Sequence, residues 1–356
     1  SELGKSLTPI GAEMAGNASG TIPAWSGGLQ LQGNAFDPAS GYANPFAADQ
    51  PLFTINQGNL EQYREQLSPG QVAMLERYPQ SWQLAVYPSR RSASYPAKVY
   101  DAAKANATTA KLVDGGNGIA DFHTATPFPI PQSALEVLWN HLARYRGDSA
   151  ERYYAQAVPQ PGGDYFMTHM VDQFLFNQGA GDPSQSDGNI LFYFRQSIVA
   201  PARLAGTKSL VHETVNQVSE PRLSWLYAAG QRRVRRAPNV AYDSPGSASE
   251  GLRTTDNFDM FSGAPDRYDW QLVGKKEMYV PYNNYRFAAR SNKYSDMIKA
   301  GHVNPDLLRY ELHRVWHIRA TLKPGSRHQY KQRDLYLDED SYQILLADHY
   351  DNRDTI

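Results

Sequence analysis

The spacing of hydrophobic residues along the chain changes near residue 150. Before that point, apolar side chains recur every three or four residues, which is typical of amphipathic helices. From about residue 151 onward they alternate with polar residues, which is the pattern of half-buried β-strands. Short turns rich in Gly, Pro, Asp and Ser separate the alternating segments. The pattern therefore predicts helices first and an antiparallel meander second, in place of a βαβ fold.

Four helices are predicted in the first half. They span about residues 56–67, 68–78, 97–110 and 133–146. The second has the strongest start signal, because Ser68 can cap it, Pro69 suits its first position and Gln71 completes a capping box. The fourth has the clearest apolar face, and Gly147 can end it. That face contains Leu135, Leu138, Trp139 and Leu142.

The predicted strands follow at regular intervals. They are 151–158, 165–176, 190–200, 208–218, 222–227, 231–237, 268–280, 311–323, 327–338 and 342–350, and one short helix near 295–300 interrupts them. Residues 1–55 are rich in Gly, Pro, Asn and Ala and cannot bury a core of their own. We therefore expect a single α+β domain over 1–356, with an irregular wrapping arm at 1–55, a helical cover at 56–150 and a sheet at 151–356.

One predicted hairpin, at 221–238, joins an aromatic strand to a basic strand. Trp225 and Tyr227 share one face of the first strand, Gly230 is expected to supply the positive φ of the turn, and Pro238 is expected to end the second strand. The basic strand carries Arg232, Arg233, Arg235 and Arg236. Two interpretations remain open: a solvated strand whose arginine stems cover apolar surface, or a docking surface for an anionic partner.

Arg90 and Arg91 form a second basic pair, between Tyr87 and Tyr95. Two adjacent guanidinium groups can bind a carboxylate or phosphate through paired hydrogen bonds. They can equally tie the helical half of the chain to acidic positions on the sheet. Both roles remain open at this stage.

The overall composition excludes several classes of protein and site. The net charge is −1 and charged residues make up 20% of the 356 residues, so the bulk charge gives no reason to expect a nucleic-acid partner. No apolar run approaches the roughly 18 residues of a membrane-spanning helix. The chain has no cysteine, which excludes disulfides, thiolate zinc sites and thiol nucleophiles.

His313 and His317 have the spacing of a helical zinc pair, but their neighbours alternate as in a strand. On a strand, four residues separate the two imidazoles by roughly 13 Å, at ~3.3 Å per residue. One metal ion cannot bridge that distance without other ligands. We therefore expect no metal site at these histidines.

Other short motifs give no stronger sign of catalysis. Asp121 and His123, and likewise Asp348 and His349, place a carboxylate near an imidazole, but no GxSxG elbow accompanies them. Residues 115–118 lack the frame of a phosphate-binding loop and predict a turn. The sequence therefore predicts a protein that is not an enzyme and needs no cofactor.

The two ends of the sequence suggest processing. It begins at Ser1 rather than Met, so we expect that a leader was removed or the chain was trimmed. Residues 351–354 have the composition of a hairpin turn, yet no returning strand follows. We therefore expect that the C-terminus is truncated.

Several stretches together resemble a known family. They are ELGKSLTPIGAEMAGNASGTIPAWSGGL, YPSRRSASYPAKVYDAAKANAT, LVDGGNGI, PFPIPQSALEVLWNHLARYRG, GQRRVRRAP, DRYDWQLVGKKEMYVPYNNY and LADHYDNR. They are similar to a proteobacterial family of periplasmic proteins of unknown function, often labelled outer-membrane lipoprotein-sorting proteins. The resemblance implies a strongly curved antiparallel sheet, an open half-barrel like that of LolA and LolB, with helices on its concave face. It also implies export to the Gram-negative periplasm and, in some members, association with RND-type inner-membrane exporters and outer-membrane proteins.

These expectations lead to one main hypothesis about function. We expect a non-enzymatic periplasmic carrier that holds a lipid, a lipoprotein or another hydrophobic molecule between sheet and helices. Its expected binding residues are Phe192, Phe194, Trp225, Tyr227, Trp316, Trp139 and Leu142. The alternative is a structural or docking component of an envelope export assembly, with a filled interior and a basic docking surface.

Overall fold

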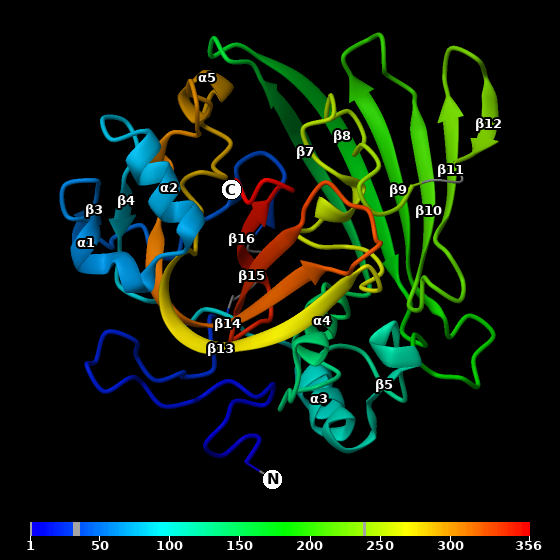
Figure 1. The fold of residues 1–356 in the computed structure, drawn as a ribbon, viewed down its shortest axis with the longest axis horizontal. Coiled ribbons are helices and arrows are strands. Elements are labelled where there is room, and N and C mark those ends of the chain that lie inside the picture. Colours follow the sequence, from blue (N-terminus) through cyan, green and yellow to red (C-terminus); the bar gives the residue numbers. More distant parts are fainter. Residues whose placement is uncertain (1, 31–35, 238–239) are drawn as a thin grey trace.

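Two curved sheets organise the chain in the computed structural model, which describes residues 2–30, 36–237 and 240–356 (Figure 1). The first sheet is a six-stranded antiparallel meander. Its strands are β7 (Ser149–Pro159), β8 (Tyr165–Phe176), β9 (Ile190–Ala200), β10 (Lys208–Thr214), β11 (Leu223–Ala228) and β12 (Arg233–Arg236). They lie in chain order, so each strand pairs with the next one along the chain. The alternating segments after residue 150 are therefore strands, as the sequence predicts.

The second sheet combines strands from both halves of the chain. Its order is β16-β15-β14-β4-β3, and β13 pairs with the other edge of β14. The strands are β3 (Phe53–Ile55), β4 (Leu84–Val86), β13 (Tyr268–Pro281), β14 (Tyr310–Leu322), β15 (Gln332–Asp338) and β16 (Ile344–Tyr350). The sequence predicts one continuous meander, but the chain leaves strand conformation after β12. Residues 240–262 cross the inner face of the first sheet before β13 begins the second.

The predicted helices are present, and most are shorter than expected. The helices are α1 (Leu60–Tyr63), α2 (Pro69–Arg77), α3 (Ala97–Thr109), α4 (Ala134–Leu142) and α5 (Tyr294–Met297). The capping box predicted at Ser68 and Gln71 is present. Small two-stranded sheets join β1 (Phe36–Asp37) to β2 (Gly41–Tyr42), and β5 (Lys111–Val113) to β6 (Gly118–Ala120). Among the helices of the described residues, none has the length and apolar character needed to cross a bilayer.

The second sheet is strongly curved. Met278 and Val280 of β13 pack in one cluster with Val315 of β14, Tyr336 of β15 and Leu346 of β16. Side chains from the outer strands β13 and β16 can meet in this way only on the concave face. The mostly antiparallel, curved and open architecture predicted from the sequence is thus confirmed.

Helix α2 bridges the gap between β13 and β16. On one side, the Gln71 side chain donates to the backbone carbonyl of Tyr279 in β13, at 2.8 Å. On the other side, the Gly70 N–H donates to Asp348 of β16 at 3.0 Å. The helix therefore satisfies an edge carbonyl and closes the concave side of the sheet.

Helix α4 packs against the opposite face of the same sheet. Leu138 lies in a cluster with Ile318, Leu335 and Leu337, whose side chains alternate with those of the concave face. Trp139 belongs to a separate cluster beneath β5 and β6, and its indole N–H donates to the Gly116 carbonyl at 2.9 Å. The helix is thus buried on several sides.

Arg91 ties the N-terminal arm to the second sheet. Its guanidinium donates to both carboxylate oxygens of Asp340, at 2.8 and 3.0 Å. The same group donates to the backbone carbonyls of Glu13, Met14 and Pro23, at 2.7–3.2 Å. A single buried side chain therefore connects the irregular arm to the turn between β15 and β16.

Candidate functional site

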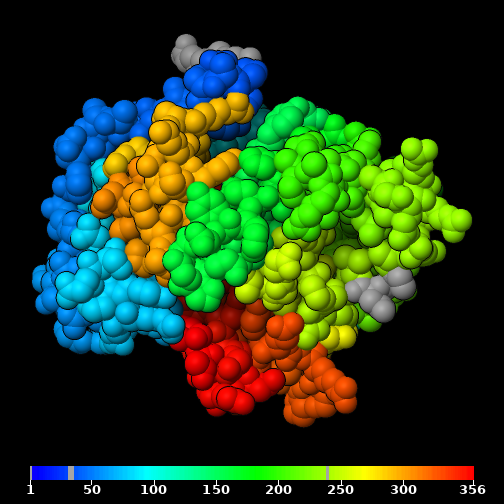
Figure 2. Space-filling model, turned by 90° about the horizontal axis from the view of Figure 1, so that it is seen from above, coloured from blue at the N-terminus to red at the C-terminus, as the bar shows by residue number. Residues whose placement is uncertain are grey.

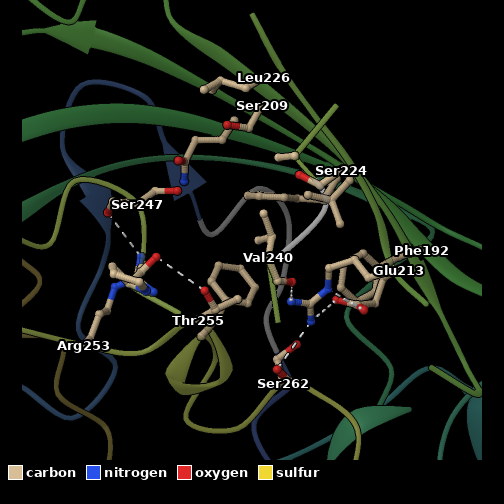
Figure 3. Close-up of a pocket in the computed structure, with 18 residues that line it drawn as sticks. Phe192, Ser209, Glu213, Ser224, Leu226, Val240, Ser247, Arg253, Thr255 and Ser262 are labelled. Carbon is tan, nitrogen blue, oxygen red and sulfur yellow. Dashed lines mark hydrogen bonds and ion pairs between the residues drawn. The ribbon is translucent and has the colours of Figure 1, made fainter. Parts of the chain in front are cut away.

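A cavity of about 200 Å³ lies between the inner face of the first sheet and the segment 240–262 (Figure 3). The sheet contributes inward-facing residues of β9, β10 and β11, including Phe192, Val211 and Leu226. The segment contributes Val240 and Phe258 from the other side. The cavity therefore has apolar walls on both sides, and strand alternation provides one of them.

A cluster of phenylalanine rings lies on the inner face of β8 and β9, beside the cavity. The ring of Phe174 lies 4.8 Å from that of Phe194 and 5.8 Å from that of Phe192. Phe258, on the covering segment, lies 5.5 Å from Phe194. Such contacts between rings fix the wall while leaving the adjoining space unfilled.

The cavity runs from a buried end to an exposed rim. Phe192 is only 4% exposed, whereas Leu226 is 40% exposed. Ser247, which also lines the cavity, lies exposed on the covering segment. In the space-filling view the segment 240–262 reaches the surface between the first sheet and the strands of the second (Figure 2). A ligand could therefore enter at the rim without crossing either sheet.

The covering segment has an unusual backbone. Five of its non-glycine residues have positive φ: Tyr242, Ala248, Glu250, Asp259 and Met260. Side-chain and backbone bonds hold it in place, among them a bond from Gln156 of β7 to the Ala248 carbonyl. This segment is not a strand because its turns and left-handed residues prevent an extended ladder.

A buried ion pair lies at the deep end of the cavity. Arg222 donates to Glu213 through Nε at 2.9 Å, and a second contact between the two groups measures 2.7 Å. The remaining guanidinium donors reach the carbonyls of Val240 and Ser262, at 3.0 and 3.4 Å. Because its partners are all internal, this pair adds polarity to the wall but no net charge.

Arg253 differs from Arg222 in having only neutral acceptors. Its Nε donates to the Gln156 side chain at 3.2 Å, and its Nη2 donates to the Ser247 carbonyl at 3.5 Å. Among the described residues, no carboxylate lies within ion-pair distance of its guanidinium. Burial lowers the pKa of Arg253 from its ordinary value, because the charged form loses hydration.

The structure does not bring the seven predicted binding residues together. Phe192 and Phe194 line the cavity beneath the segment 240–262. Trp225 and Tyr227 lie on the opposite face of β11, because residues that alternate along a strand face opposite sides. The expectation that they share one pocket with Phe192 was therefore wrong.

The other three predicted binding residues lie in the packed core around α4. Trp139 and Leu142 belong to the cluster beneath β5 and β6, and Trp316 packs against the α4 side of the second sheet. Among the described residues, a space of about 10 Å³ adjoins Trp139 and Leu142, and one of about 40 Å³ adjoins Leu142 alone of the two. Both are far smaller than the cavity beneath the first sheet. The pocket expected between α4 and the sheet is therefore replaced by close packing.

The basic hairpin forms as predicted, with β11 paired to β12. Its four arginines, Arg232, Arg233, Arg235 and Arg236, are all exposed. Arg235 pairs across from Leu226, so it lies on the same face as the cavity rim. The positive φ of the turn belongs to Arg232, at 50°, and not to Gly230. Pro238, expected to end the strand, lies outside the described residues.

The side chains of Arg90 and Arg91 bind acids of this chain, and of the two only that of Arg91 reaches an acid next to the sheet strands. Arg90 donates to Asp49 at 2.6 Å, and the buried Arg91 binds Asp340. The carboxylate of Asp49 also accepts from Arg309, and these arginines lower its pKa to about 2. The pair thus neutralises buried and half-buried acids of this protein.

One group of buried residues has the donor types of a metal site. Within the described residues, ligand atoms of His313, Asp338 and Asp340 lie within 4.8 Å of one another. Each is already engaged: Asp340 by Arg91, Asp338 by the Tyr282 hydroxyl at 2.8 Å, and His313 by a glutamate of its own strand at 2.9 Å. These internal partners make the group a charge network of the second sheet.

The histidines and acids of β14 and β16 also have structural partners. Strand β14 contains His313 and His317 as predicted, and His317 contacts Asp334 at 2.6 Å. Asp348 caps α2, whereas His349 faces the other way and stacks on Tyr330 at 4.3 Å. Adjacent residues on a strand cannot act as a pair, because they face opposite sides.

Sequence reasoning missed the three charged residues of the cavity: Glu213, Arg222 and Arg253. Glu213 alternates with Ser209 and Val211 on the inner face of β10, and a carboxylate at that position was the available signal for a buried charge. Nothing in the local pattern around Arg253 indicates burial, because a loop brings it to the sheet. Only the tertiary structure could place it in the cavity.

Comparison with known proteins gives relatives but no activity. The chain is 58% identical over all of its 356 residues to the uncharacterized protein PA3922 of Pseudomonas aeruginosa and covers 78% of that protein. A DUF1329 family protein from Desulfovibrio piger matches with 16% identity and a TM-score of 0.39, over 59% of this chain and 69% of that one. A putative outer membrane lipoprotein-sorting protein domain from Vibrio parahaemolyticus matches with 15% identity and a TM-score of 0.40, over 62% and 73%.

The sequence profile of the DUF1329 family, described as a protein of unknown function, matches residues 54–356. That range contains both sheets except for the first residue of β3, helices α1 to α5 and every residue of the cavity described above. The chain therefore belongs to the DUF1329 family.

Proposed function

We propose that this protein is a non-enzymatic carrier that binds one apolar chain or small apolar molecule in the cavity beneath the first sheet. The observation that supports this is a cavity of about 200 Å³ with apolar walls and an open rim. An engineered apolar cavity of about 150 Å³ is enough to hold benzene. Each Å² of apolar ligand surface removed from water contributes about 25 cal/mol.

The cavity volume limits the cargo. Typical ligand pockets begin at about 300 Å³, so this one encloses less than a drug-sized molecule. A lipoprotein with several acyl chains would not fit inside it in this conformation. The proposal therefore favours a single-chain lipid or a small hydrophobic molecule as the enclosed part of the cargo.

A cavity-filling substitution tests the proposal. Val211 lines the cavity and Val199 lies exposed outside it, so Val211→Trp and Val199→Trp form a matched pair. We expect the uncharged fluorescent probe N-phenyl-1-naphthylamine to bind the wild type and Val199→Trp, but not Val211→Trp. If Val211→Trp does not fold, Ala237→Phe at the rim serves instead. Failure of the wild type to bind the probe would refute the proposal.

The basic hairpin favours a second, compatible role in docking. Its exposed arginines adjoin the rim, where a carrier would exchange cargo with an anionic surface or partner. We also propose that the protein works in the Gram-negative periplasm with an RND-type exporter and an outer-membrane protein. The sequence resemblance supports this setting, and co-purification from the native envelope after crosslinking is its test.

A further inference from the structure

The charges that line the cavity are unequal. They comprise Arg222, Arg253 and Glu213, which sum to +1. The first and last of these form a closed pair at 2.7 Å, and the pair's further bonds are internal. The excess positive charge therefore belongs to Arg253.

No carboxylate of the described residues forms an ion pair with Arg253. The carboxylate with most influence on its charge is Asp172, which is buried. Arg152 already binds that carboxylate through two donors, at 2.8 and 2.9 Å. Among the described residues, the acceptors that contact Arg253 are the neutral Gln156 side chain and the Ser247 carbonyl. A guanidinium held by neutral acceptors still lacks a counter-charge.

The position of Arg253 in the cavity defines where the anionic group of a ligand would bind. Ser247, its neighbour, is exposed at the rim, whereas Phe192 at the far end is 4% exposed. Phe194, Val211 and Phe258 line the same cavity. The site thus has a cationic group near its opening and an apolar interior.

Resting on the carrier role proposed above, we infer that the ligand is a single-chain amphiphile with an anionic head, such as a fatty acid. Its carboxylate binds Arg253 at the rim and its alkyl chain extends toward Phe192. Arginine suits this role because its planar donors match the two oxygens of a carboxylate. The exposed Arg233 and Arg235, on the same sheet face as the rim, favour the approach of anions over cations.

The test compares two ligands that share one alkyl chain. Dodecanoate and dodecanol are titrated against wild-type protein loaded with N-phenyl-1-naphthylamine, and displacement is followed by fluorescence. We expect dodecanoate to bind about 10- to 100-fold more tightly than dodecanol, the range that a charge-assisted hydrogen bond supplies. Arg253→Gln should abolish this preference and leave the dodecanol affinity unchanged.

The control variant is Arg327→Gln, which removes an exposed arginine in the turn between β14 and β15 and should keep the preference. The wild type provides a second readout that needs no substitution. Below about pH 4 the carboxylate of dodecanoate is protonated, so its affinity should approach that of dodecanol.

The outcomes separate this inference from the proposed function. Probe binding with equal affinity for dodecanoate and dodecanol would overturn the inference and leave the carrier role intact. If Arg253→Gln lowers the affinities for dodecanoate and dodecanol equally, Arg253 only supports the fold of the cavity. That result would also overturn the inference. Absence of binding by any apolar compound would instead refute the carrier role itself.

Discussion

The two sheets share antiparallel pairing but differ in what covers their inner faces. The concave face of the second sheet is closed by α2 and filled by residues such as Tyr336. The inner face of the first sheet is covered by an irregular segment and retains a cavity of about 200 Å³. The comparison shows that a sheet face covered by a helix is closely packed. The face covered by the irregular connection between the sheets keeps space for a ligand.

The largest expected change in the free energy of unfolding distinguishes a residue of the packed core from one in the cavity wall. Trp139 is 2% exposed, so Trp139→Ala should lower the free energy of unfolding by about 3–5 kcal/mol. Phe194 is half-buried and already borders empty space, so Phe194→Ala should cost less than half as much. Urea unfolding of both variants measures the difference. Equal losses would mean that the first sheet is packed as tightly as the second.

The next effect concerns the buried charges of the second sheet. Asp340→Asn removes the counter-charge of the buried Arg91, and breaking such a pair costs about 3 kcal/mol. Because Arg91 also holds the arm, residues 2–30 should become more sensitive to limited proteolysis. Glu61→Gln breaks an exposed pair with Arg64 and should leave the free energy of unfolding nearly unchanged. If Asp340→Asn is as stable as the wild type, the ion pair between Arg91 and Asp340 does not stabilise the fold.

A smaller, pH-dependent effect comes from Asp338. Burial, and then the neighbouring Asp340, raise the pKa of Asp338 to about 6 in the folded protein, from 3.8. The folded state therefore binds this proton more tightly than the unfolded state does. The stability that this provides is present below about pH 4 and is lost as the pH rises to about 6.

Comparison of the wild type with Asp338→Asn isolates this effect from other titrating groups. The free energy of unfolding of the wild type, relative to the variant, should fall between pH 4 and pH 6 and stay level above pH 7. Urea titrations at fixed pH values measure it. A difference that is constant across this range would contradict the raised pKa.

The smallest effect on stability is expected at the basic hairpin. Arg233→Glu with Arg235→Glu changes exposed side chains, so the free energy of unfolding should shift by less than about 0.5 kcal/mol. Flotation with vesicles that contain anionic phospholipid should nevertheless show weaker binding than the wild type. Lys323→Glu with Arg327→Glu, in an exposed turn of the second sheet, is the matched control. Equal flotation of both double variants would exclude docking by the hairpin.

Sequence patterns predicted regular elements well because alternation and capping act locally. The strand around His313, the capping box at Ser68 and the basic hairpin all form. The same patterns could not separate the strands into two sheets, because that division depends on where an irregular segment packs. The patterns also placed part of the binding site at Trp139. An aromatic residue on an amphipathic helix indicates burial, but it does not show whether the residue is core or the wall of a pocket.

The left-handed residues of the segment 240–262 have a consequence for the rate of ligand exchange. A non-glycine residue in that conformation costs about 1 kcal/mol or more, and the segment contains five. When this segment opens, its backbone strain is relieved, which offsets part of the free energy that opening costs. The strands of the first sheet keep their hydrogen bonds meanwhile. We therefore expect the residence time of a bound chain to be set by the opening of this cover. Substitutions such as Ala248→Gly would then alter the dissociation rate more than the association rate.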